Sequence, residues 1–174
     1  MRRGVVGIFY FVSVWVHLLA AIVWIGGMVF LAAVLVPALR RNEYSFLSAS
    51  LIQWTGRRFR WVGWLCLVAL VLTGFVNLSY RGIGWHALAS GELWQTSFGR
   101  VLGAKLILLA AILSLSIFHD FVIGPRAAKV LREKLQSNEA RTLRRQASWI
   151  GRINLLLAVA VVALGTMLLR GTPW

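Results

Sequence analysis

The fold is decided by residues 5–39, which read VVGIFYFVSVWVHLLAAIVWIGGMVFLAAVLVPAL. This run contains no Lys, Arg, Asp or Glu, and His17 is its one titratable side chain of near-neutral pKa. A helix needs about 20 apolar residues to cross the hydrocarbon core of a bilayer. The run is longer than the apolar core of a signal peptide and no Ala-x-Ala site closes it, so we interpret it as a retained membrane helix.

The rest of the chain has the same character. Of its 174 residues, 59% are hydrophobic and 14% are charged, and the mean hydropathy is +0.76. Soluble domains are roughly 45–50% apolar and about 25% charged. We therefore predict an all-α fold, a four-helix transmembrane bundle that forms a single integral membrane domain over residues 1–174. Its spans are expected at about 8–38, 60–80, 100–123 and 152–170, with helix ends at Pro37 and Gly124-Pro125.

The basic residues are distributed in a way that orients such a bundle. Net charge is +14, but the charges lie between apolar runs, which argues against a nucleic-acid partner. Thirteen of the 19 Lys and Arg residues lie in the first and third connections, the latter including the basic segment 126–148, and five lie at the other ends. The positive-inside rule then places both termini on the non-cytoplasmic side of a bacterial cytoplasmic (inner) membrane, with the lipid bilayer as the main partner.

Three histidines are candidate metal ligands, because neutral imidazole suits both copper and haem iron. They are His17 in the first span, His86 in the outer loop and His119 near the inner end of the third span. His17 and His119 differ in depth by roughly 15–25 Å at 1.5 Å per residue, so they are not expected to share one iron, whereas His17 and His86 lie on the same side. A histidine hydrogen-bonded across a helix interface is the alternative.

Lys105 is the expected charge partner of such a centre. A charge at mid-membrane costs about 2.5–3.5 kcal/mol on insertion scales, so an intramembrane lysine indicates a function unless it extends to the interface. With Arg81 and Arg100, Lys105 is a candidate cofactor-binding group that would meet the propionates of a haem. Cys66 is the one cysteine and is expected to be a packing residue; no motif of a soluble enzyme appears, and no catalytic residue is assigned.

Four stretches resemble the copper resistance protein D (CopD) family. They are His17–Met28, Arg58–Trp61 leading into Leu72–Phe75, Ser97–Lys105, and His119–Phe121 with Gly124-Pro125-Arg126. The resemblance implies a role in copper uptake or tolerance at the inner membrane. A more distant similarity connects the chain to the four-helix protoporphyrinogen oxidase of the HemJ type, which carries haem b and has a first-helix histidine and a third-helix lysine.

Three functions stay open from the sequence. The first is a CopD-like protein that binds a redox metal centre, haem b or copper, and acts in copper handling or membrane electron transfer, with a periplasmic redox or copper protein as partner. The second is a structural or accessory subunit of a larger respiratory or photosynthetic membrane complex. The third is a HemJ-like oxidase, so the sequence leaves open whether the chain is an enzyme.

Overall fold

The computed structural model describes residues 2–39, 41, 45–133 and 138–170. These residues form helices joined by short turns, and no strand occurs among them. The chain runs through α1 (Arg2–Phe30), η1 (Leu31–Leu35), α2 (Val36–Ala38) and α3 (Ser45–Tyr80). It continues through α4 (Trp85–Ala89), η3 (Glu92–Gln95), α5 (Ser97–Ile117), η4 (Phe118–Ile123), α6 (Gly124–Glu133) and α7 (Asn138–Arg170).

Four helical segments are long and apolar enough to cross a membrane, which confirms the prediction of an all-α chain with four such helices. They are Gly7–Ala38, Ser50–Tyr80, Ser97–Ala127 and Arg141–Arg170. Only 6–17% of the residues in their most apolar windows are buried within the molecule. The remaining residues of these windows expose a large apolar surface, whose contact with water is unfavourable, so a lipid bilayer must cover it.

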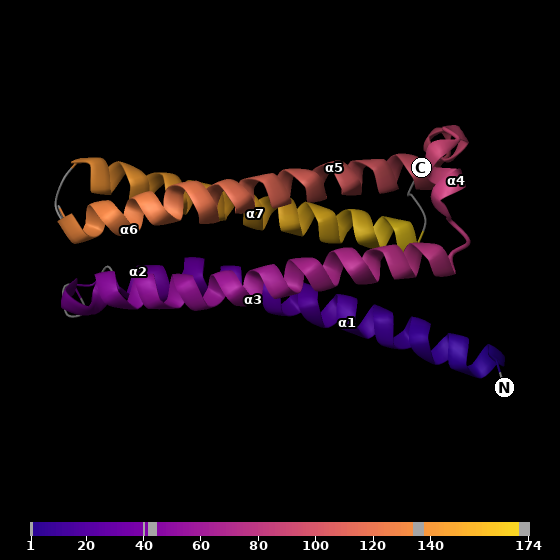
Figure 1. Cartoon of the computed structure of the whole chain (residues 1–174), viewed down its shortest axis with the longest axis horizontal. Coiled ribbons are helices and arrows are strands. Elements are labelled where there is room, and N and C mark those ends of the chain that lie inside the picture. Colours follow the sequence, from indigo (N-terminus) through magenta and orange to yellow (C-terminus); the bar gives the residue numbers. More distant parts are fainter. Residues whose placement is uncertain (1, 40, 42–44, 134–137, 171–174) are drawn as a thin grey trace.

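The helices form two antiparallel pairs, α1 with α3 and α5 with α7, as Figure 1 shows. The start of α1 and the end of α7 lie at the same end of the molecule as α4, whereas α2 and α6 lie at the opposite end. The first and third connections are therefore at one end. Part of the basic segment 126–148 (residues 134–137) lies outside the described residues.

Of the two prolines, Pro37 lies one residue before its helix ends at Ala38, as expected, whereas the helix continues through Pro125 to Glu133, which corrects the expected end at Gly124-Pro125. Each proline lies just after a π-helical turn, η1 or η4, in the helical segment α2 or α6 that follows it. A proline ring clashes with the carbonyl four residues earlier and lacks an N–H. Those carbonyls belong to Ala33 and Phe121, inside the π turns, so the wider turn accommodates the clash without ending the helix.

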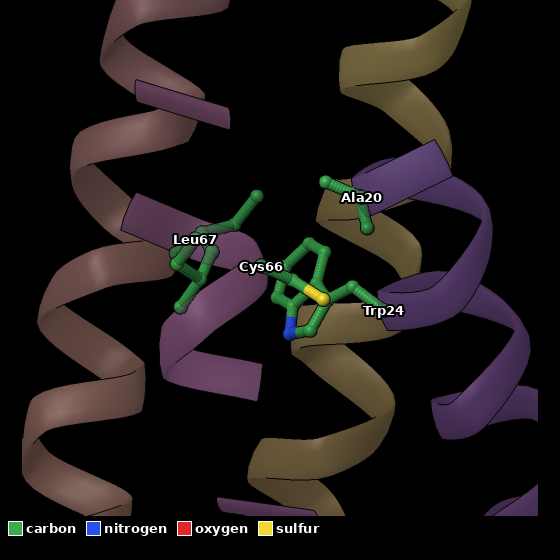
Figure 2. Packing of buried hydrophobic residues seen from close by; sticks show 6 residues of the cluster. Ala20, Trp24, Cys66 and Leu67 are labelled. Atoms are coloured by element: carbon green, nitrogen blue, oxygen red, sulfur yellow. The ribbon is translucent and has the colours of Figure 1, made fainter. Parts of the chain in front are cut away.

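The core is small and lies where all four long helices meet. Its buried residues are Ala20, Trp24, Cys66, Leu67, Ile112 and Ala158. In Figure 2 the Cys66 sulfur lies beside the Trp24 indole. The expected packing role of Cys66 agrees with its burial as a free thiol.

Small residues and polar links hold the helix pairs together, because lipid provides no hydrophobic drive for helices to associate. A β-carbon added at Gly27 would overlap the Phe59 ring, so α1 approaches α3 closely there. In the other pair, the buried Asn154 amide of α7 donates a 3.0 Å hydrogen bond to the Ser116 hydroxyl of α5.

The outer loop is anchored to the start of α5. Gly91 adopts a left-handed conformation with φ of 83°, and η3 then runs to Thr96, whose hydroxyl accepts the Gly99 N–H at 2.9 Å and caps α5. A β-carbon at Gly99 would collide with the Leu93 carbonyl, so the glycine permits η3 to pack against the helix. This turn fixes the register of α5, and therefore the depth of Lys105.

Candidate functional site

His17 is oriented by a hydrogen bond to Thr73 on α3. The Thr73 hydroxyl donates its hydrogen to the Ala69 carbonyl at 2.5 Å, as threonines in helices often do. With that hydrogen directed at Ala69, we assign Nδ1–H of His17 as the donor in its 2.8 Å contact with Thr73 Oγ1. In the neutral imidazole, Nε2 therefore carries the free lone pair. This is the arrangement in which histidine ligates metals in proteins.

The surroundings of Thr73 keep the His17 ring at the seam between α1 and α3. Ser13, one turn before His17, donates a 3.5 Å hydrogen bond to the Thr73 carbonyl. A β-carbon at Gly74 would lie 3.8 Å from His17 Cε1, an ordinary van der Waals distance, so the ring lies beside α3 at this position. The imidazole itself thus contacts Thr73 through Nδ1 and lies beside Gly74 of the same helix.

Lys105 extends from α5 toward α7. Its ammonium lies beside Gly165, where an added β-carbon would be 3.7 Å from Nζ. Among the residues that the structure describes, no hydrogen bond or ion pair reaches this ammonium. Lys105 and His17 are close enough for their charges to interact. The lysine is therefore directed at the bundle, beside the neighbouring helix.

Arg81 brings a second cation to the same part of α7. It follows the last residue of α3 and donates a 3.1 Å hydrogen bond from Nη1 to the Leu168 carbonyl, with its guanidinium over the Phe98 ring. Gly165 and Leu168 are three residues apart, which is about 4.5 Å along a helix. Arg81 also interacts electrostatically with Lys105. We call His17, Arg81 and Lys105 the outer basic site.

The outer basic site has an excess of positive charge. The charged groups that act on Lys105 and His17 are themselves cations, Arg81 and Lys105. Glu92, the acidic residue of the outer loop, is exposed and forms no ion pair within the described part of the chain. Intramembrane charges usually pair with a partner or face a polar cavity. Arg81 and Lys105 are suited to anionic groups, whereas His17 offers a neutral nitrogen to a metal.

Arg100 and His86 lie apart from this group. Arg100 is exposed and its guanidinium contacts Ser97 in its own helix, at 3.3 Å. His86 is exposed on the five-residue helix α4, whose neighbouring Trp85 packs on Phe75. Of the six candidate residues from the sequence, the structure brings together His17, Arg81 and Lys105.

His119 belongs to a separate polar network at the other end of the bundle. Its Nδ1 lies 2.9 Å from Asp120 Oδ1, and the Trp64 indole donates to Asp120 Oδ2, also at 2.9 Å. Arg60 Nε is 3.5 Å from the same carboxylate. Trp64 and Thr73 are nine residues apart on α3, which is about 13.5 Å. His17 and His119 thus lie at separate polar sites.

The structure adds residues that the sequence did not assign to a site. Thr73 orients His17, and Arg60 and Trp64 hold Asp120 from α3. Within the described residues, no three His, Cys, Asp or Glu side chains gather in a way that could hold a metal ion tightly. Cys66 lies seven residues from Thr73 on α3, about 10 Å along the helix, and does not join the site.

Comparison with known proteins connects these features to a family. The model of the copper resistance protein D family (CopD) matches residues 54–168, a stretch that includes Thr73, Arg81 and Lys105 but not His17. An uncharacterized protein of Aquifex aeolicus (strain VF5) is 30% identical over 161 residues, which are 89% of this chain and 92% of that protein. No solved structure matches.

Proposed function

Because the chain belongs to the copper resistance protein D family, we propose that it handles copper in the membrane and that His17 is the residue where copper binds within the bundle. The observation that carries this assignment is the hydrogen bond from His17 Nδ1 to Thr73, which leaves Nε2 free. An imidazole held by a partner on one nitrogen and open at the other is ready to bind a metal without rearrangement.

The positive charge near His17 is compatible with a copper ion that binds transiently and is then released. Lys105 carries a fixed positive charge close to His17, and this charge weakens the binding of a copper ion at Nε2. A site on a transport path must bind well enough to admit the ion and weakly enough to release it. His17 supported by Thr73 supplies the attraction, and Lys105 limits it.

The orientation follows from the distribution of charge. With the first and third connections in the cytoplasm, both termini and the outer basic site face the periplasm of a bacterial inner membrane. Copper would then reach His17 from the periplasmic side, and a periplasmic copper protein is the partner that this arrangement implies. The position of the two basic connections at one end of the bundle supports this orientation.

Haem b is the second candidate, favoured by the pair of cations. Lys105 and Arg81 lie near residues one turn apart on α7 and have no acidic partner among the described side chains, so they suit the two propionates of a haem. His17 Nε2 would hold the haem iron. Bound haem would supply one-electron redox chemistry, and the protein would then act in electron transfer.

The test of the copper assignment is the copper content of cells that produce the protein. Production of the wild-type chain should change cell copper relative to an empty vector, and His17→Ala at equal membrane abundance should abolish that change. Ser13→Ala is the matched control, because it removes a hydrogen bond to Thr73 but retains the imidazole. If His17→Ala alters cell copper as much as the wild type does, the assignment is wrong.

An optical spectrum separates the two candidates. Detergent-purified protein should be colourless and bind copper if copper is the cargo. A dithionite-reduced spectrum with the sharp band of b-type haem, lost in His17→Ala, would establish the haem candidate instead.

A further inference from the structure

One face of α3 combines basic, aromatic and apolar residues that point away from the bundle. Its members are spaced three or four residues apart and so share one side of the helix. They are Trp54, Arg57, Arg58, Trp61, Leu65, Val68 and Leu72. All seven are exposed. We call this surface the α3 outer face.

The basic end of this face forms a pocket. Trp54, Arg57, Arg58 and Trp61 surround an open hollow of about 320 Å³ on the helix surface. The Arg58 guanidinium lies over the Trp54 ring, 5.6 Å from its centroid. Within the described residues neither Arg57 nor Arg58 forms an ion pair. Two exposed guanidiniums flanked by indoles, in the part of α3 nearest the basic end of the bundle, are suited to a phosphate group at the level of lipid headgroups.

The other end of the face is an apolar track. Trp61 is 80% exposed, Leu65 74% and Leu72 60%. Val68 and Leu72 also line a second pocket, of about 160 Å³, between α3 and Leu113 of α5, and its walls are entirely apolar. Such a groove along a helix fits an acyl chain.

The length of the track matches one leaflet. Trp61 and Leu72 are eleven residues apart, which is about 16 Å along a helix. The hydrocarbon core is about 30 Å thick, so one leaflet contributes about 15 Å. A lipid with its phosphate at Arg57 and Arg58 would therefore reach the second pocket with the methyl end of an acyl chain.

We propose that the α3 outer face is a specific site for an anionic phospholipid of the leaflet at the basic end of the bundle. The phosphate binds Arg57 and Arg58, the indoles of Trp54 and Trp61 lie beside the glycerol, and one acyl chain follows Leu65, Val68 and Leu72. A second copy of the chain fits poorly, because an isologous contact through this face would bring four guanidiniums together without a counter-ion. The proposal is independent of the metal at His17.

The test compares lipid binding to the purified full-length protein by native mass spectrometry. Detergent micelles carry phosphatidylglycerol or, for comparison, zwitterionic phosphatidylcholine. The test variant is Arg57→Gln/Arg58→Gln, and its matched control is Arg145→Gln/Arg152→Gln. The control removes the same charge from α7, where the Arg152 guanidinium also lies 5.6 Å from the centroid of a tryptophan ring. Each arginine at the level of the headgroups strengthens binding of an anionic lipid by roughly fivefold, so loss of both should weaken phosphatidylglycerol binding roughly thirtyfold. The control variant should bind phosphatidylglycerol like the wild type.

A second variant tests the acyl track without altering charge. Val68→Trp places a large ring in the groove at a position that faces lipid, so the fold should tolerate it, and phosphatidylglycerol binding should fall. Equal phosphatidylglycerol binding by the wild type and Arg57→Gln/Arg58→Gln would overturn the proposal. A second result would also overturn the proposal: the wild type is a dimer without preference between the two lipids, and Arg57→Gln/Arg58→Gln is a monomer.

Discussion

At the scale of single residues, the central feature is an imidazole whose hydrogen bonding is determined by a neighbour. Thr73 can accept from His17 but has no hydrogen left to donate to it, because that hydrogen is bonded to Ala69. The threonine thus selects the tautomer that leaves Nε2 open. Lys105 adds a positive charge near the same ring. Binding of copper or of a haem iron at His17 would depend on both groups.

Thr73→Val should weaken copper binding by about tenfold or more, because loss of the partner that orients a metal-ligating histidine typically costs 10–100-fold in affinity. The measurement is a competition titration of purified protein against a Cu(I) chelator. Ser79→Ala is the control, since the Ser79 hydroxyl bonds only to Phe75 of its own helix among the described residues. Equal affinities for Thr73→Val and the wild type would show that Thr73 does not position the ligand.

Lys105→Met should stabilise the purified apoprotein while removing function. The ammonium has no partner among the described side chains, and its removal relieves the repulsion from Arg81, so stability should rise by about 1 kcal/mol or more. Thermal unfolding in detergent measures this change. Arg126→Met, at an exposed position outside the bundle core, should leave stability within about 0.5 kcal/mol of the wild type. A marked loss of stability in Lys105→Met would mean that the ammonium is paired.

The sequence could identify His17 and Lys105 because each is a polar group in an apolar run. It could not identify their neighbours. Thr73 reaches His17 from 56 residues away, and Arg81 meets Leu168 from 87 residues away. Both contacts depend on the register of antiparallel helices, which close packing such as that of Gly27 against the Phe59 ring helps to set. Hydropathy contains no information about that register.

At the scale of helices, close approach and polar links replace the hydrophobic effect. Gly27 admits the Phe59 ring, Asn154 bonds to Ser116, and Asp120 connects η4 to α3 through Trp64. The four spans could be predicted from hydropathy alone. The π turns before the prolines could not, because a proline in a helix is compatible with an end, a kink or a widened turn.

Gly27→Leu should destabilise the α1–α3 pair, because any side chain there overlaps Phe59 and overpacking costs about 1–3 kcal/mol. Gly26→Leu is the matched control, because it makes the same substitution at the adjacent residue. A β-carbon at Gly26 meets nothing within 4 Å, so this change should be neutral or slightly stabilising through better helix propensity. Thermal unfolding of both variants in detergent gives the comparison, and equal effects would show that α1 does not approach α3 through Gly27.

At the scale of the whole molecule, the arrangement is a loosely packed bundle with polar groups at two depths. The outer basic site lies near the end that carries α4, and the Asp120 network lies toward the end that carries α6. The apolar surface between them faces lipid. Composition predicts this architecture well, since so apolar a chain cannot fold as a soluble domain of its size.

Single-cysteine labelling tests the proposed orientation. In a Cys66→Ala background, Ser90→Cys in the outer loop should react with a membrane-impermeant maleimide in intact cells, because the proposed orientation places that loop in the periplasm. Gln146→Cys, exposed near the start of α7, should react only after the membrane is permeabilised. The opposite pattern would reverse the topology and place the outer basic site on the cytoplasmic side.

The affinity of the purified protein for Cu(I), with and without His17, tests the central claim most directly. Competition against a Cu(I) chelator should show one site on the wild type, and His17→Ala should weaken it by more than a hundredfold, beyond the range for loss of an orienting partner. Ser13→Ala should bind like the wild type. Wild-type affinity in His17→Ala, or no Cu(I) binding by the wild type, would contradict the assignment of His17 as the copper ligand.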